Sequence, residues 1–387
     1  MRLKLTSLLL LLVSILQAQN IQLSSDAEIS ALTIGPGTYL VDSFGHSAFR
    51  VRDRQNRIDT VFNYGSYDFT TSNFYLKFAQ GKLKYRLATN SYSDFFEFYM
   101  AQNRTVVEQI LNLSHPQKQQ LFDYLLNNAK PENQYYLYDF FFDNCATKLK
   151  DVLQETNNNK LVFANPDEFQ PKTFRKLIHE HLELNSWGSL GIDVALGAVI
   201  DRQATAEEHM FLPKFIYRFF DKATFKQSGE PLVKTTRVLY EEVEKAKSSS
   251  FLFSPLIIFG IISFLILYIT YRDFKNNVRT KWIDTSLFIL TGVIGVFILL
   301  LWFATDHTAT ANNYNLLWAF PLNLFIIRQL SKRNQWFIKY LKFLVIMLCL
   351  MTLHWTIGVQ VFAIGLIPLL LALIVRYTYL IKCFQKG

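Results

Sequence analysis

Hydrophobic residues are distributed unevenly along the chain, and the pattern changes near residue 250. Residues 19–250 carry frequent charges, and their apolar runs are shorter than a membrane span requires. After Ser248-Ser249-Ser250, five long apolar runs follow, at about Phe251–Tyr271, Ser286–Phe303, Leu316–Ile327, Phe343–Trp355 and Ile357–Leu380. We therefore predict a globular domain over residues 19–250, followed by a helical transmembrane domain of about five spans over residues 251–387.

The first residues have the pattern of a secretory signal peptide. Arg2 and Lys4 precede the apolar run Leu8–Leu12, and the small residue Ala18 lies at the expected cleavage site. We predict a signal peptide at residues 1–18. An N-terminal membrane anchor is the alternative, but the apolar run is short for a span.

Basic residues in the connections between the apolar runs indicate an orientation. The first and third connections hold Arg272, Lys275, Arg279, Lys281, Arg328, Lys332, Arg333 and Lys339. The connection at residues 304–313 holds no lysine or arginine. By the positive-inside rule the basic connections are cytoplasmic, which puts residues 19–250 in the periplasm, on a multi-pass protein of the inner membrane. Much of the formal charge of +9 belongs to these loops, so it indicates no nucleic-acid partner.

Strand and helix patterns both occur in the exported domain, which predicts an α+β fold. Ser47–Arg52 and Asp59–Tyr64 have strand character and are joined by a polar hairpin connection. Helical spacing or composition is found at Asn73–Phe78, Asp94–Gln102 and Pro116–Ala129.

Cys145 is the candidate nucleophile of this domain, because no other cysteine occurs in the first 348 residues. The apolar spacing over Ala146–Leu153 predicts a helix that begins here, with Asp143 or Asn144 as its N-cap. Backbone N–H groups in a first helical turn favour a thiolate. His46, in a predicted strand, is the candidate base. A small buried cysteine without chemistry is the alternative.

Several phrases resemble the exported domain of the Lnb-type lipoprotein N-acyltransferases. They are Phe44-Gly-His-Ser-Ala-Phe-Arg-Val, Val61-Phe-Asn-Tyr-Gly, Tyr138-Asp-Phe-Phe-Phe-Asp-Asn-Cys and Phe211-Leu-Pro. The resemblance covers about residues 25–235, and the multi-span tail is also typical of such membrane-attached members. More distantly, a strand histidine before Asn-Cys at a helix start resembles the circularly permuted NlpC/P60 enzymes, such as the lecithin–retinol acyltransferase group. The resemblance therefore implies a permuted NlpC/P60-like, papain-type exported domain.

The resemblance also implies a reaction, in which an acyl group passes from a phospholipid to the N-terminal diacylglyceryl-cysteine of a lipoprotein through a thioester. It implies Cys145 as nucleophile and His46 as general base. Asn63 or Tyr64 would orient the imidazole, and Asn144 stands beside the nucleophile. The expected partners are a phospholipid donor, a lipoprotein acceptor and the membrane, and no cofactor or metal is expected.

Two other functions are compatible with the sequence, one catalytic and one not. The wider fold also contains peptidoglycan-active cysteine peptidases and amidases, whose thiol attacks an amide carbonyl. A non-catalytic membrane assembly module is the third reading. The five expected spans favour the acyltransferase, because both of its substrates are anchored in a membrane.

Three smaller features have weaker claims. His179-Glu180-His181 suggests zinc, but residues i and i+2 of a helix point apart, and a solvated face is the simpler reading. Asp306-His307 is predicted to lie in a loop at the periplasmic surface of the inner membrane, where it could approach the active site or a lipid headgroup. An interfacial loop without a role in chemistry is an equally good interpretation. Arg50 and Arg52 could meet a phosphate, although strand-surface arginines are usually solvated.

Overall fold

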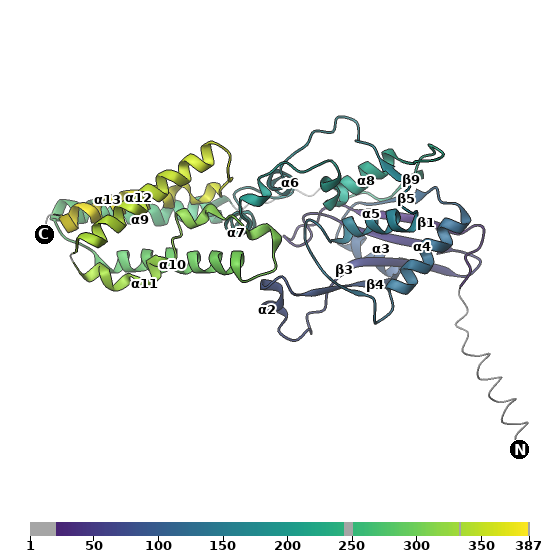
Figure 1. Cartoon of the computed structure of the whole chain (residues 1–387), viewed down its shortest axis with the longest axis horizontal. Helices are drawn as coiled ribbons and strands as arrows, with labels where there is room; N and C mark the ends of the chain where they lie inside the picture. The colour runs from purple at the N-terminus through teal and green to yellow at the C-terminus, as the bar shows by residue number, and fades with distance from the viewer. Residues whose placement is uncertain (1–20, 244–250, 333, 386–387) are drawn as a thin grey trace, which may run out of the picture.

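The computed structural model describes residues 21–243, 251–332 and 334–385, so the predicted signal peptide lies outside the described residues. A sheet domain and a bundle of long helices follow one another along the molecule's longest axis (Figure 1). The predicted order, an α+β domain followed by a helical membrane domain, is confirmed.

The centre of the periplasmic domain is a seven-stranded sheet in which every neighbouring pair is antiparallel. Its strand order is β6-β4-β3-β2-β1-β5-β9. The strands are β1 (Glu28–Ile34), β2 (His46–Asp53), β3 (Ile58–Ser66), β4 (Lys84–Ser91), β5 (Val106–Leu111), β6 (Tyr135–Leu137) and β9 (Val233–Tyr240). The hairpin β2–β3 matches the two strands that the sequence predicts, and both run in the middle of the sheet.

Helices cover both faces of this sheet, because the side chains of a strand alternate between the faces. Phe49 and Val51 of β2 belong to the large core beneath α4, α5 and α8, whereas Ala48 packs with Phe95 and Tyr99 of α3 on the other face. The helices of the domain are α2 (Phe74–Ala79), α3 (Tyr92–Ala101), α4 (His115–Asn128), α5 (Cys145–Thr156), α6 (Phe174–His179), α7 (Trp187–Ala195) and α8 (Pro213–Lys222). A separate hairpin pairs β7 (Leu161–Phe163) with β8 (Ala223–Phe225).

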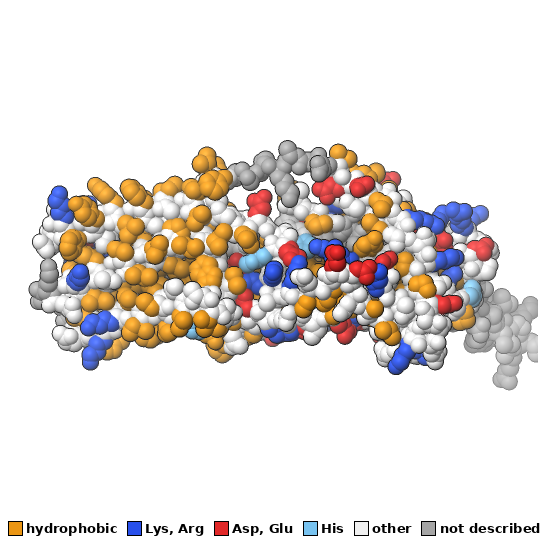
Figure 2. Space-filling view, turned by 90° about the horizontal axis from the view of Figure 1, so that it is seen from above, with side chains coloured by type: hydrophobic (Ala, Val, Ile, Leu, Met, Phe, Trp, Pro, Cys, Tyr) orange, Lys and Arg blue, Asp and Glu red, His pale blue; other side chains and the backbone are white. Residues whose placement is uncertain are grey.

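Four helices of the described bundle are long and apolar enough to cross a membrane. They are α9 (Pro255–Asn276), α10 (Lys281–Phe303), α12 (Gln335–Thr356) and α13 (Ile367–Gln385), the last preceded by a 3-10 turn at Ile364–Leu366. A 23-residue helix such as α10 is roughly 34 Å long, which suffices for the hydrocarbon core of a bilayer. Hydrophobic side chains cover the bundle, and Lys and Arg side chains gather at its far end (Figure 2).

The third predicted run does not form a continuous helix. It is divided into a 3-10 turn at Tyr314–Leu317, the short helix α11 (Leu322–Phe325) and another 3-10 turn at Ile327–Ser331. The segment still returns from the periplasmic end to the cytoplasmic end, because the side chain of Asn315 bonds Asp193 O in the sheet domain and Leu330 O accepts from Arg279. Within the described residues 251–385, the bundle therefore consists of four long helices and one broken segment that runs between the same two ends.

Small residues on α10 explain how the broken segment packs. A Cβ at Gly292 would lie 2.4 Å from Leu324 N, and one at Gly295 would lie 2.1 Å from Ala319 O. Only glycine permits the backbone of the third run to come so close to the helix. Asn323 then anchors the segment with bonds to Thr291 (2.8 Å) and Tyr340 (2.5 Å).

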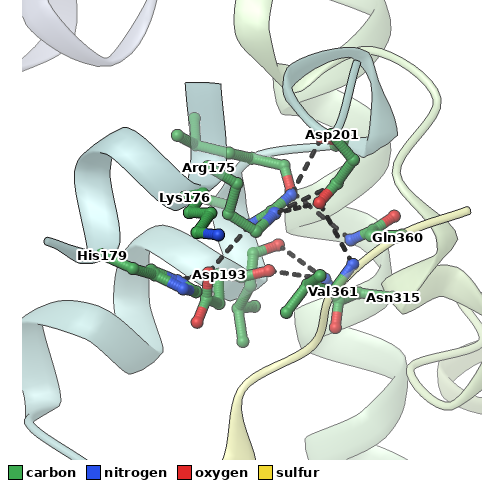
Figure 3. Close-up of polar contacts among 12 residues, drawn as sticks. Arg175, Lys176, His179, Asp193, Asp201, Asn315, Gln360 and Val361 are labelled. Atoms are coloured by element: carbon green, nitrogen blue, oxygen red, sulfur yellow. Dashed lines mark hydrogen bonds and ion pairs between the residues drawn. The ribbon is translucent and has the colours of Figure 1, made fainter. Parts of the chain in front are cut away.

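A buried polar cluster fixes the sheet domain on the bundle (Figure 3). Arg175 of α6 pairs with Asp193 at 2.8 Å and with Asp201 at 2.8 Å. Asp201 accepts from Val361 N at 3.2 Å, and Asn315 donates to Asp193 O at 2.8 Å, so both acidic residues also hold membrane-domain loops. These contacts therefore fix the orientation of the sheet domain relative to the helical bundle.

Candidate active site

Helix α5 begins at Cys145, as the sequence predicts, and Asn144 rather than Asp143 is its N-cap. The Asn144 Oδ1 atom accepts from Ala146 N (2.8 Å) and Thr147 N (2.9 Å). Its amide group donates to Phe140 O (2.7 Å) and Phe211 O (2.8 Å). These four bonds occupy the side chain of Asn144, so the residue positions the start of the helix and does not face a substrate.

His46 connects Cys145 to Asn63. A Cβ built on Gly65 would lie 3.6 Å from Cys145 Cβ and 3.9 Å from His46 Cε1, so the imidazole and the thiol are neighbours. The Nε2 atom of His46 lies 2.6 Å from Asn63 Oδ1. An amide oxygen only accepts, so Nε2 carries the proton and donates it to Asn63. Nδ1 is then the nitrogen that is left for the thiol. The three residues form a cysteine–histidine–asparagine row, which is the arrangement that a thiol nucleophile, its base and an orienting group require.

Charge stabilises the ionised form of this pair. Burial opposes a thiolate, but the imidazolium of His46, its hydrogen bond and the N–H groups of Ser47 and Ala146 together hold the pKa of Cys145 below its ordinary value. Burial also opposes the charged His46, but the thiolate and the bonds to Cys145 and Asn63 raise the pKa of His46. The site therefore favours the thiolate–imidazolium pair.

The structure separates the two candidates for the third position. Asn63 contacts His46, whereas the hydroxyl of Tyr64 donates to Asn128 Oδ1 at 2.6 Å and its ring is buried in the core under α4. Adjacent residues of a strand point to opposite faces, so only one of the two can reach His46. The prediction of a site role for Tyr64 is therefore corrected to a packing role.

Gly65 passes directly over the pair and carries no side chain that would press on it. The pairing of β3 with β4 is irregular between Asn63 and Ser66, and Gly65 has φ +90° there. A Cβ at this position would lie 3.6 Å from Cys145 Cβ and 3.9 Å from the Cε1 atom of His46. Glycine adopts this left-handed conformation without strain and places no side chain against the thiol.

The family phrases converge around this site. Phe140, from the phrase before the cysteine, packs edge-on against Phe44 (4.9 Å) and against Phe211 (5.6 Å). Segments that lie far apart in the sequence therefore build one aromatic cluster next to Asn144, the residue that caps the helix of Cys145.

The other sequence motifs lie outside the site. His179 bonds Asp193 at 2.9 Å and His181 bonds Ser43 O at 3.1 Å, so the two point apart, and no cluster of metal ligands occurs among the described residues. Arg50 is buried between Asp59 (2.7 Å) and Glu108 (3.0 Å), so the expectation of a solvated or phosphate-binding Arg50 is wrong.

The loop that contains Asp306-His307 joins the membrane domain to the neighbourhood of the site. Asp306 N donates to Gln80 O (2.9 Å), His307 Nε2 contacts Phe78 O (3.0 Å), and Thr308 donates to Asp139 (2.7 Å). Asp139 belongs to the turn that precedes Cys145. The sequence predicted that this loop lies at the membrane surface, but it did not show that the loop bonds both the end of α2 and the turn before Cys145.

Fold and site together define a membrane-bound protein with a periplasmic cysteine–histidine–asparagine site. Comparison with family models gives two matches, the Lnb N-terminal periplasmic domain over residues 17–180 and the Lnb transmembrane domain over residues 246–387. The two domains of one family together take in most of the chain, which belongs to the Lnb family. No curated protein and no solved structure matches the chain.

Family membership confirms two predictions. The chain is a multi-pass protein of the inner membrane with its N-terminal domain in the periplasm, and it is related to lipoprotein maturation. The permuted NlpC/P60 arrangement of the domain stays a prediction.

Proposed function

We propose that this protein is a lipoprotein N-acyltransferase that carries an acyl group on Cys145 between a phospholipid and the α-amino group of a diacylglyceryl-cysteine. The observation that carries the proposal is the Cys145–His46–Asn63 row, together with the bond between a loop of the membrane domain and Asp139 in the turn before Cys145. A thiol that acts on lipids needs this position, because both of its substrates are anchored in the same leaflet.

In the first half-reaction the Cys145 thiolate attacks the carbonyl carbon of a phospholipid ester. The backbone N–H of Cys145, which the Asn144 cap does not occupy, is the donor at the start of α5 that can stabilise the oxyanion. The carbon–oxygen ester bond then breaks, and the imidazolium of His46 gives its proton to the departing alcohol of the lysophospholipid. The product is a thioester on Cys145 and a neutral His46.

In the second half-reaction the amine of the acceptor attacks the thioester carbonyl. His46 takes the proton that the amine loses, the carbon–sulfur bond breaks, and the thiolate returns beside an imidazolium. The new bond is the amide of the mature lipoprotein. Asn63 keeps the imidazole in the tautomer and orientation that both steps need.

A labelling experiment tests this function. Cells that express the protein receive an alkyne fatty acid, and the isolated protein is examined for a label that hydroxylamine releases, with Cys145→Ala as the control. We expect the label on the wild-type chain and none on the variant. An unlabelled wild-type chain together with altered muropeptides in the variant would instead indicate the peptidase or amidase function. Absence of both label and phenotype would indicate the assembly module.

A further inference from the structure

Helix α2 lies on the side of the periplasmic domain that is nearer to the helical bundle (Figure 1). Its apolar side chains are exposed. Tyr75 is 79 % exposed and Leu76 is 57 % exposed, and Phe69 and Phe78 nearby are also exposed. A cluster of this kind on a water-soluble surface marks a contact with an apolar partner. In this chain nothing within the described domain covers it.

The position of α2 shows what that partner is. Its carbonyl groups at Phe78 and Gln80 hold the loop that leaves Phe303, the last residue of the spanning helix α10. Phe303 itself is exposed and stacks on Trp302 at 4.7 Å, the arrangement of an interfacial aromatic anchor. The apolar surface of α2 is therefore level with the outer end of a membrane span.

A second apolar loop lies on the other side of His46 in the sequence. Tyr39, Leu40 and Val41 are exposed, Val41 to 82 %. Leu40 lies against Gly188 of α7, since a Cβ there would come within 3.0 Å of it. The neighbouring Trp187 donates to Phe253 O (2.9 Å) at the entrance to α9. This loop too is tied to the outer end of the bundle.

An aromatic row leads from α2 toward the thiol. Phe74 of α2 packs with Tyr67 (5.9 Å), Tyr67 with Tyr85 (5.3 Å), and Tyr85 stacks on Tyr138 at 4.2 Å. The bridge between Asp139 and Asp143 folds the chain back so that Tyr138 lies beside the start of α5. Burial and then the charge of the Cys145 thiolate raise the pKa of Tyr138, so its hydroxyl stays neutral there. The row thus joins the exposed surface to the nucleophile through aromatic rings, none of which carries a charge.

We propose that α2 and the Tyr39–Val41 loop insert into the outer leaflet of the inner membrane and that the aromatic row guides an acyl chain from the leaflet to Cys145. This inference rests on the proposed function for its substrate, and it names the lipid surface as the partner of the two loops. A lipid chain fits the row because it is apolar, narrow and flexible, and because both loops are joined to membrane-spanning helices.

The test uses the full-length protein in vesicles of phosphatidylethanolamine and phosphatidylglycerol. Acylation of Cys145 is measured from the vesicle lipid and, separately, from p-nitrophenyl butyrate, a short ester that reaches the thiol from water. The variant is Tyr75→Ser with Leu76→Ser, and the control is Val162→Ser with Val238→Ser, two exposed apolar positions on β7 and β9. We expect the α2 variant to lose roughly tenfold or more of the rate from vesicles, with the butyrate rate retained.

Two outcomes overturn the inference while leaving the function in place. One is an α2 variant that takes acyl groups from vesicles as fast as the control does. The other is an equal loss with both esters, which would show damage to the site rather than to lipid access.

If Cys145 of the wild-type chain is acylated neither by vesicle lipid nor by p-nitrophenyl butyrate, the proposed function fails. A crosslinking measurement then tests the membrane contact of α2 by itself. A benzophenone amino acid is placed at position 76 and, as control, at position 238, and the chain is irradiated in vesicles. Lipid adducts at position 76 and none at position 238 support the membrane contact independently of catalysis. Adducts at position 76 with protein alone would overturn it in favour of a protein partner.

Discussion

The two nitrogen atoms of His46 have different roles, and Asn63 holds the ring in the orientation that both roles require. With Nε2 bound to Asn63 at 2.6 Å, the ring cannot turn its other nitrogen away from Cys145 without losing that bond. Asn63 does not touch the reacting atoms in the proposed mechanism. It is a positioning residue, and its loss is expected to appear in the rate and pH profile of the reaction rather than in the folding of the domain.

Replacement of Asn63 by alanine should lower the rate of Cys145 acylation about a hundredfold, because the imidazole loses its orientation. Tyr64→Phe is the matched control. It removes one buried hydrogen bond to Asn128 and should cost about 1 kcal/mol of unfolding free energy while leaving the acylation rate unchanged. Rate and thermal unfolding are measured on both variants. Equal effects of the two variants on the rate would remove the special role of Asn63.

The pH dependence follows from the opposite pKa shifts of the pair. The pKa of Cys145 is lowered and that of His46 is raised from 6.5, and both shifts favour the coexistence of thiolate and imidazolium. Acylation should rise with pH as the thiol of Cys145 loses its proton, and fall again as pH passes through the raised pKa of His46.

The rise of this profile at low pH reports the deprotonation of Cys145, and it can be measured separately as the pH dependence of alkylation by iodoacetamide. The measurement uses a chain with Cys349→Ala and Cys383→Ala, so that only Cys145 reacts. In His46→Ala the alkylation rate should rise only at higher pH, because the thiolate loses the imidazolium that stabilises it. An alkylation rate that rises at the same pH in His46→Ala as in the wild-type chain would show that the helix start alone activates the thiol.

Among the structural elements, the irregular end of β3 has the most direct effect on the site. The irregularity lets the chain place Asn63 against His46 and, two residues later, pass Cys145 with a glycine that has φ +90°. A side chain at position 65 would both strain the backbone and crowd the thiol.

Gly65→Ala should therefore lose stability and most of the acylation rate. Gly229→Ala is the control, since Gly229 has φ +72° but a Cβ added there would meet no atom within 4 Å. Both variants should lose about 1 kcal/mol or more of unfolding free energy from backbone strain, and only Gly65→Ala should also lose activity at temperatures where it is folded. An active Gly65→Ala enzyme would mean that the acyl group approaches Cys145 from another side.

Local sequence patterns predicted the elements that carry the site, but not every contact between them. The hairpin of β2 and β3 and the capped start of α5 follow from alternation, spacing and a capping residue, all of which are local. The choice between Asn63 and Tyr64 depends on strand pairing and its irregularity, which one strand does not show. The broken third crossing depends on Gly292 and Gly295 of another helix. Exposed aromatic residues on α2 look like core residues until the fold places them.

For the molecule as a whole, the contact between the two domains decides whether the thiol meets the membrane. Arg175 is almost fully buried and pairs with two acidic residues that also hold loops of the bundle. Breaking such a buried group leaves unpaired carboxylates, so the cost is larger than that of a surface pair.

Arg175→Ala should lower the unfolding free energy by about 3–5 kcal/mol, whereas Arg202→Ala, which breaks the more exposed pair with Glu208, should cost less than about 1 kcal/mol. Thermal unfolding of the full chain in detergent measures both. The acylation rate from vesicles should also fall in Arg175→Ala, because the domain loses its fixed orientation above the membrane. Similar melting temperatures of the two variants would argue against the cluster as the main connection.

The central claim, a lipid-derived acyl group on Cys145, is tested most directly by mass spectrometry of the purified full-length protein. The protein is incubated with phospholipid vesicles alone, digested, and the peptide that contains Cys145 is weighed, with Cys145→Ser as control. We predict a mass increase of one fatty acyl group on Cys145, removed by hydroxylamine and lost when a diacylglyceryl-cysteine peptide is added. An unmodified Cys145 after incubation with lipid, or an adduct that the acceptor peptide does not remove, would contradict this claim.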